Sequence, residues 1–171
     1  TAGAKAFNVN AKVKVGPATV ELNHAEVAYD LNAAAVTALG AEVTTKQSRI
    51  IASVKAGPAT VTAGYVKTGD KGGNVTLGDT DAKSNFVLEN MSATATTDAS
   101  IYYLGAKAKV AGVTIGLEHA RTSDYNKNSL GINESKLSVA YAMSKNFKVS
   151  GFMTQMTTET AGATADTEND M

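Results

Sequence analysis

The chain has 171 residues, a length that suits one domain, and 43% of them are hydrophobic, mostly Ala and Val in short alternations. Sixteen basic and sixteen acidic residues cancel, so the charge gives no reason to expect a nucleic-acid partner. The absence of cysteine excludes disulfides and thiolate metal sites, and no apolar run reaches the roughly 18 residues of a membrane-spanning helix. A water-soluble β-sandwich of this size would need more Leu, Ile and Phe to fill its core.

The first predicted hairpin covers residues 5–29. Every second residue from Phe7 to Val15 is apolar, and the residues between them include Lys12 and Lys14. This period of two is typical of a strand with one apolar and one polar face. Gly16-Pro17 interrupts the alternation and predicts a tight turn, because proline cannot donate to a ladder and glycine tolerates unusual backbone angles.

Three further hairpins follow the same pattern, at residues 48–68, 100–121 and 136–156. Gly57-Pro58 repeats the first turn, Ala111-Gly112 forms the third, and residues 144–146 form the fourth. Together the hairpins predict about eight strands of roughly ten residues.

Polar segments connect these hairpins. Residues 69–99 and 122–135 are predicted long loops, and 158–171 is a predicted polar tail. Between residues 30 and 48 the pattern is ambiguous: 32–36 fits a short helix, and 41–45 fits an extension of the next strand. Residues 74–77 and 85–88 are candidate short strands within the first long loop.

Short turns at one end of the strands and long polar loops at the other predict an all-β fold. We expect residues 1–157 to form an antiparallel up-and-down transmembrane β-barrel, since tilted strands of 9 to 11 residues cross a bilayer. Both ends of this strand set are expected on the long-loop side, which predicts a segment of a larger barrel with at least one further strand at each end. A complete eight-stranded barrel fits the length but not this parity.

The polar strand faces supply candidate pore-lining residues, because the face opposite the lipid faces the lumen. Charged side chains in such positions select ions by sign, and most of these lysines lie near a short turn, which predicts a basic belt at one mouth. The alternative is that the lysines protect strand ends. The candidates are Lys12, Lys14, Glu21, Asn23, Arg49, Lys55, Lys107, Lys109, Glu118 and Lys148.

Three segments, 52–70, 102–119 and 136–154, resemble a bacterial outer-membrane porin. The phrases Val61-Thr62-Ala63-Gly64-Tyr65-Val66-Lys67-Thr68-Gly69 and Val139-Ala140-Tyr141-Ala142-Met143-Ser144-Lys145-Asn146-Phe147 are similar to the C-terminal part of the Campylobacter-type major outer membrane porin family. The resemblance implies a trimeric barrel in the bacterial outer membrane, surrounded by lipid, through which small hydrophilic solutes and ions diffuse. Aromatic girdles are expected at both lipid interfaces, and the candidates are Phe7, Tyr29, Tyr65, Tyr102, Tyr103, Tyr141, Phe147 and Phe152.

Other chemistry has little support in the sequence. His24 and His119 lack metal-ligand spacing and are expected to be structural or surface residues. No cofactor is expected, although acidic groups at Asp70, Asp79 and Asp81, or at Asp166, Glu168 and Asp170, are candidates for a loop-bound Ca²⁺. No catalytic constellation occurs, so an enzyme is not expected. The alternative to a porin is a secreted β-rich subunit of a filament or surface layer.

Overall fold

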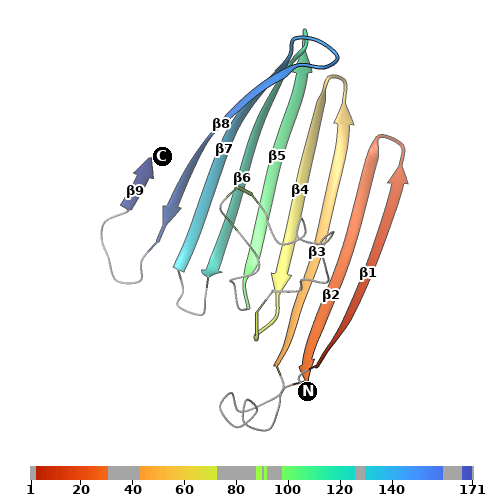
Figure 1. The fold of residues 1–171 in the computed structure, drawn as a ribbon, viewed down its shortest axis with the longest axis vertical. Coiled ribbons are helices and arrows are strands. Elements are labelled where there is room, and N and C mark those ends of the chain that lie inside the picture. Colours follow the sequence, from red (N-terminus) through yellow and green to blue (C-terminus); the bar gives the residue numbers. More distant parts are fainter. Residues whose placement is uncertain are drawn as a thin grey trace.

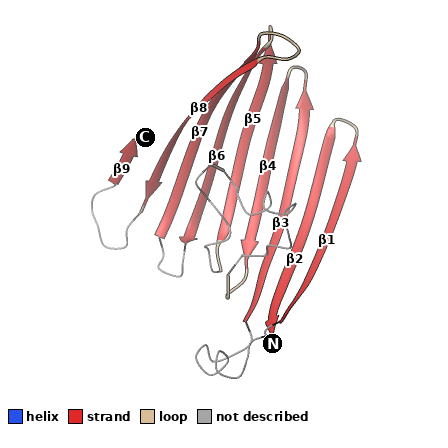
Figure 2. Ribbon diagram, viewed as in Figure 1, coloured by secondary structure: helices blue, strands red, loops and turns tan. Residues whose placement is uncertain are grey.

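The computed structural model describes residues 3–30, 43–72, 88–89, 91, 98–125, 130–159 and 167–170. In this part of the chain nine antiparallel strands form a single sheet in sequence order, each paired with the next, and β1 is not paired with β9 (Figures 1 and 2). The strands are β1 Gly3–Val15, β2 Ala18–Asp30, β3 Val43–Ala56, β4 Ala59–Thr68, β5 Ser100–Val110, β6 Val113–Tyr125, β7 Leu130–Ala142, β8 Lys148–Thr158 and β9 Thr167–Asp170.

Tight turns join the strands at one end of the sheet, which we call the short-turn end; the opposite end is the long-loop end. Gly16 and Gly57 have φ of 57° and 59° and each precedes a proline. A glycine at the first central position fits the type II′ turn, whose twist matches that of the flanking strands. Ala111 and Gly112 have φ of 50° and 83°, as a type I′ turn requires at both central positions.

The strand registers divide the side chains between two faces. On one face, which we call the apolar face, Ala11, Leu22 and Ile50 lie side by side, and the row continues through Tyr65 and Tyr102. On the other, the lysine face, Lys12 lies opposite Glu21 and Lys107 opposite Gly116. Large side chains on the apolar face are solvent-exposed in the isolated chain, among them Val13 at 54% and Leu117 at 63%. One face of this sheet is therefore unsuited to water.

The hairpins are staggered along the sheet. Ala18 of β2 pairs with Val54, two residues before the end of β3, and Ala59 of β4 pairs with Ala108, two residues before the end of β5. The short turns therefore climb from β1–β2 towards β7–β8 (Figure 1). A climb of one residue per strand, about 3.3 Å along for about 4.8 Å across, corresponds to a strand tilt of roughly 35°. Membrane barrels have this tilt.

Buried residues gather on the lysine face towards the long-loop end. One cluster contains Val66, Ile101, Ala120 and Ile132, and it is completed by Leu88, Met91 and Ala99 from the connection between β4 and β5. A second, smaller cluster contains Ala25 and Val27 with Tyr29 packed against them. The apolar face has no comparable cover among the described residues, so the sheet is covered from one side only.

Two predicted loop regions contain strand. Residues 122–125 and 130–135 were expected in a long loop, but β6 continues to Tyr125 and β7 begins at Leu130. The sequence there is mostly polar, and burial explains the order: Thr122 and Glu134 are both 0% exposed, and Ile132 joins the buried hydrophobic residues. In the predicted tail, residues 167–170 form β9 and pair with β8.

Some of the predicted segments lie outside the described residues. These are the candidate helix at 32–36, the candidate strand at 74–77 and residues 85–87 of the candidate strand at 85–88. The extension proposed at 41–45 is present from Val43, where β3 begins.

A filament subunit built as a sandwich would need two packed sheets, whereas all strands of the described ranges belong to one sheet. No helix in those ranges is long and apolar enough to cross a membrane.

Candidate pore-lining face

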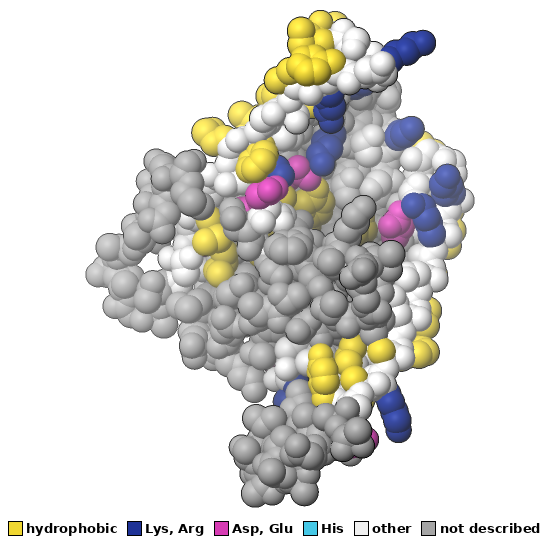
Figure 3. All heavy atoms as spheres, in the orientation of Figure 1, with side chains coloured by type: hydrophobic (Ala, Val, Ile, Leu, Met, Phe, Trp, Pro, Cys, Tyr) yellow, Lys and Arg dark blue, Asp and Glu magenta, His cyan; other side chains and the backbone are white. Residues whose placement is uncertain are grey.

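Four lysines form a row along the short-turn end of the lysine face. Each of the four hairpins contributes one, at or next to the strand end that borders its turn: Lys14, Lys55, Lys109 and Lys148. The row therefore follows the stagger of the turns. It runs parallel to the edge of the sheet that the short turns form, which we call the rim. The side-chain ammonium groups of these four lysines have no hydrogen-bond or ion-pair partner within the described part of the chain. Figure 3 shows Lys and Arg side chains gathered towards this end.

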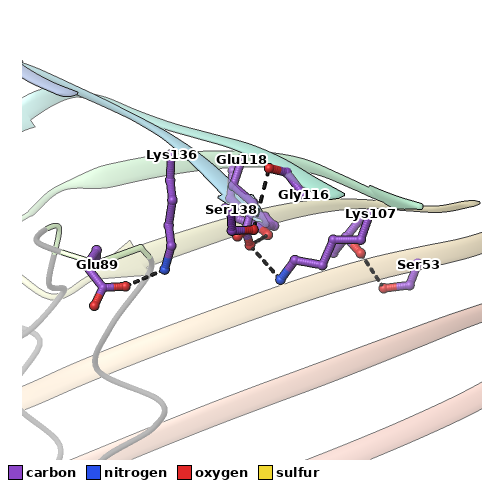
Figure 4. A network of polar contacts seen from close by, with 9 residues as sticks. Ser53, Glu89, Lys107, Gly116, Glu118, Lys136 and Ser138 are labelled. Atoms are coloured by element: carbon purple, nitrogen blue, oxygen red, sulfur yellow. Dashed lines mark hydrogen bonds and ion pairs between the residues drawn. The ribbon is translucent and has the colours of Figure 1, made fainter. Parts of the chain in front are cut away.

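Lysines further from the rim are paired with carboxylates. Lys12 of β1 contacts Glu21 of β2, and Lys107 Nζ lies 3.1 Å from Glu118 Oε1 on β6. Tyr103 donates its hydroxyl proton to the same carboxylate oxygen of Glu118, at 2.6 Å. Glu118 is 9% exposed, so this largely buried carboxylate lies between a phenol and the ammonium group of Lys107, whose contact with it is drawn in Figure 4. Positive charge is compensated here and uncompensated at the rim.

Two glycines make room for these side chains to lie flat over the strands. A Cβ at Gly105 would stand 2.5 Å from the Tyr103 hydroxyl oxygen, and one at Gly116 would stand 2.5 Å from Ser138 Oγ and 3.2 Å from Lys107 Cγ. Any other residue at these positions would displace the polar network. Glycine at both positions therefore leaves the space that the side chains of Tyr103, Lys107 and Ser138 occupy.

A hollow of about 270 Å³ lies beside this network on β5 to β8. Its lining includes three lysines and one aromatic ring, Lys107, Lys136, Lys148 and Phe152, together with Glu118. Lys136 Nζ lies 4.5 Å from the centroid of Phe152, within the range of a cation–π contact. The hollow thus combines positive charge with an apolar wall.

The connection between β4 and β5 is anchored on the long-loop half of the lysine face. The Met91 N–H donates to Glu134 Oε2 at 2.7 Å, and Glu89 forms an ion pair with Lys136 (Figure 4). Met91 is 1% exposed and Glu134 is fully buried. A buried carboxylate that accepts a backbone N–H fixes the segment strongly, because charge-assisted hydrogen bonds are the stronger ones. Glu89 and Met91 therefore cover part of the long-loop half of the lysine face, whereas the half with the four lysines has no such cover among the described residues.

The remaining candidates also lie on the lysine face. Asn23 donates to Asn8 Oδ1 at 2.8 Å and to Asn10 Oδ1 at 2.6 Å, forming an amide ladder across β1 and β2. Arg49 lies on β3 opposite Val66, at the edge of the buried cluster. All ten residues predicted from the sequence therefore share one face of the sheet; that they line a pore stays a prediction.

The apolar face ends in a row of polar residues that we call the polar collar. On each long strand the collar residue is the first polar side chain of this face met on the way to the long-loop end. Both histidines belong to it and pair across strands with serine: His24 Nδ1 lies 2.8 Å from Ser48 Oγ, and His119 Nδ1 lies 3.0 Å from Ser135 Oγ. The collar is Lys5, His24, Ser48, Lys67, Ser100, His119, Ser135 and Gln155.

The aromatic residues divide between the two faces. Tyr65 and Tyr102 stack on the apolar face next to the collar, with ring centroids 5.1 Å apart, as an interfacial girdle would require. Tyr29, Tyr103 and Phe152 do not fit the predicted girdle, because the registers place them on the lysine face. Proximity to a strand end did not fix which face each ring occupies.

The sequence analysis missed several residues of the site. Lys136 begins the last predicted hairpin. It lies two residues before Ser138 and therefore on the same face, and this spacing could have identified it as a residue of the lysine face. Glu89 and Glu134 lay in predicted loops, where no periodicity marks them. For the calcium proposal, Asp79, Asp81 and Asp166 lie outside the described residues, and the described ones contain no cluster of three metal-binding side chains; that site stays a prediction.

Solved structures of outer-membrane porins share this fold. Pseudomonas aeruginosa OccK1 (OpdK), also solved with vanillate, matches with a TM-score of 0.64 and 15% identity over 92% of this chain and 44% of that one. OccK9 (OpdG) of the same organism matches with a TM-score of 0.62 and 14% identity over 98% of this chain and 44% of the other. OccK10 (OpdN) gives 0.59 and 14%, over 92% and 48%.

The chain therefore spans less than half the length of the porins that it matches. No protein-family model matches the sequence, and a search of curated proteins also found no match. At this identity the comparison establishes the fold: the chain has the antiparallel up-and-down strands of a porin barrel wall.

Proposed function

We propose that this chain forms part of the wall of a bacterial outer-membrane channel through which small hydrophilic solutes and ions diffuse passively. The single observation that carries the proposal is the division of one tilted sheet into an apolar face and a lysine face. The apolar face, with residues such as Leu104 at 58% and Val110 at 62% exposed, belongs in hydrocarbon. The lysine face then lines water, and the porin fold of the solved neighbours supports the same orientation.

The charge of the lysine face supports a preference for anions. Cations outnumber carboxylates on the described strands of this face, and the four rim lysines have no described counter-ion. Rings of Lys or Arg favour anions in pores. OpdK was solved with vanillate, an aromatic carboxylate, and the hollow beside Lys148 and Phe152 offers positive charge and a ring together. We infer that small carboxylates are among the solutes.

Assembly and family are inferred from the sequence resemblance. We propose a trimer and membership in the Campylobacter-type major outer membrane porin family on the strength of the phrases at 61–69 and 139–147. A channel of this kind needs neither catalytic residues nor a cofactor. The neighbouring structures are channels rather than enzymes, which supports a transport role.

The experiment is the conductance of the full-length protein in planar bilayers. Insertion is expected to produce stepwise, ohmic current increments in KCl, with a reversal potential shifted towards chloride under a salt gradient. Benzoate added to one side should lower the chloride current by competing for the lysine face. Protein that inserts, as judged by protease protection in vesicles, yet gives no current steps would contradict the proposed function.

A further inference from the structure

A groove of about 230 Å³ crosses the apolar face over β4, β5 and β6. Its walls are the side chains of Val61, Leu104 and Leu117, and the small side chain of Ala106 leaves its floor low. Leu104 and Leu117 are 58% and 63% exposed, so they stand up as ridges beside it. Ala59 and Ala108, paired one step nearer the turns, continue the low floor. The groove is shaped for a narrow, flexible apolar chain.

The long-loop end of the groove is polar and positively charged. His119 forms part of the lining itself, with its Nδ1 on Ser135. Arg121 follows on the same face of β6, opposite Tyr102. It is exposed, and its guanidinium has no hydrogen bond or ion pair with a described residue. By contrast, the collar cation Lys67 lies 2.9 Å from Asp98 Oδ1. Among the described residues, an uncompensated strong cation therefore stands at the mouth of the groove.

We propose that the groove binds one acyl chain of a phosphate-bearing membrane lipid, whose phosphate is held by Arg121 with His119 beside it. This proposal rests on the proposed membrane location. The occupant follows from three features together: an apolar groove, a cation without a partner at its end, and a position at the boundary between the apolar band and the polar collar. Guanidinium binds phosphate through paired N–H donors, and long loops of such barrels face the outer leaflet. The lipid is therefore one of the outer leaflet, of the phosphorylated lipid A type.

Two substitutions separate the two halves of the site. Arg121→Gln removes the phosphate contact and leaves the groove, whereas Ala106→Leu fills the groove and leaves the charge. Both side chains lie on the apolar face outside the buried clusters, so folding is expected to be retained. The matched control is Lys5→Gln, which removes a collar cation on β1, away from the groove.

The measurement is native mass spectrometry of the full-length protein titrated with bis-phosphorylated lipid A, with phosphate-free diacylglycerol as the comparison lipid. Each groove variant is expected to weaken lipid A binding at least about tenfold, a change of about 1.4 kcal/mol, while Lys5→Gln leaves it unchanged. Equal binding of lipid A by Arg121→Gln and by the unsubstituted protein would overturn the proposal. So would equal binding of diacylglycerol and lipid A.

A second measurement tests whether another copy of the protein occupies the groove. The described sequence contains no cysteine, so Ala106→Cys introduces a single thiol there. Disulfide-linked dimers on oxidation in membranes would identify an interface between copies and overturn the lipid proposal; a thiol that stays monomeric supports it. Planar-bilayer currents of the same variants keep the two proposals distinct. For the groove variants we expect loss of lipid binding with intact current. Absence of current in the unsubstituted protein would contradict the proposed channel function and leave the lipid proposal standing.

Discussion

The two halves of the lysine face differ in charge and in cover. Towards the long loops, Ile101 and Ala120 are fully buried beneath Met91 and Leu88, and the carboxylate of Glu134 is enclosed with them. Towards the short turns, the same strands carry exposed lysines with no described counter-ion. The paired charges of Lys107 and Glu118 lie between these two halves.

This difference shows that one sheet face serves two purposes. Where Leu88 and Met91 pack, the wall behaves as a protein core and fixes the connection between β4 and β5. Where nothing among the described residues packs, the wall is polar and open to solution. Stability is therefore expected to depend on the covered half, and ion selectivity on the open half.

The largest expected effect comes from the covered half. Ile101→Ala removes a fully buried side chain beside Met91 and is expected to lower the free energy of unfolding by about 2–5 kcal/mol. Ser150→Ala, on the exposed part of the same face, should change it by no more than about 0.5 kcal/mol. Urea unfolding in phospholipid vesicles, followed by circular dichroism, measures both. Equal destabilisation would erase the distinction between the halves.

Reversing a rim charge should alter selectivity without altering stability. Lys109→Glu changes the local charge by two units, which at about 10 Å in water is worth roughly 0.8 kcal/mol for a monovalent ion. Because the anion loses this energy and the cation gains it, the anion-to-cation ratio should fall by roughly 16-fold. The effect should shrink at high salt because of screening. Reversal potentials in KCl gradients report it, and Lys5→Glu on the apolar face is the control. A shift of equal size in both variants would show that the rim lysines do not line the conducting path.

Removing a paired charge should have a smaller effect in the opposite direction. Glu118→Gln keeps an acceptor for the Tyr103 hydroxyl but leaves Lys107 uncompensated. The single unit of charge is worth about half as much, so roughly a fourfold rise in the anion-to-cation ratio is expected. The same reversal-potential assay measures it. An unchanged potential would mean that Glu118 and Lys107 are screened from the permeating ions.

The smallest effect concerns the turns. Ala111 has a φ of 50°, a conformation that asparagine adopts more readily than alanine. Ala111→Asn creates the Asn-Gly pair favoured in type I′ turns and should raise the free energy of unfolding by a few tenths of a kcal/mol. Replicate vesicle unfolding curves can resolve that difference. Destabilisation would mean that the alanine methyl group makes a contact that the turn geometry alone does not explain.

Period-two alternation was sufficient to predict the four hairpins and the two faces of their alternating strands. Phe7 to Val15 and Tyr102 to Val110 alternate so regularly that register follows once the turns are fixed, and Gly16-Pro17 fixes the first of them. The pairing of Lys12 with Glu21 then follows from counting residues away from the turn.

Other features depend on contacts between distant residues, which periodicity does not encode. Glu89 and Lys136 are 47 positions apart, and Met91 and Glu134 are 43 apart; each pair meets only because the connection between β4 and β5 folds onto β7. The strand content of residues 122–125 and 130–135 was missed for the same reason, since Thr122 and Glu134 are polar residues kept in strands by burial. Gly105 and Gly116 also gave no signal, because their role depends on neighbours from other strands.

The most direct test of the two-faced wall is a cysteine scan of residues 106–110 of β5 in the full-length protein. Water-soluble methanethiosulfonate reagents are expected to modify Lys107→Cys and Lys109→Cys and to reduce the current, because both lie on the lysine face. Ala106→Cys, Ala108→Cys and Val110→Cys should resist modification and keep full current. Reaction without alternation, or alternation in the opposite phase, would contradict the assignment of the lysine face to the pore.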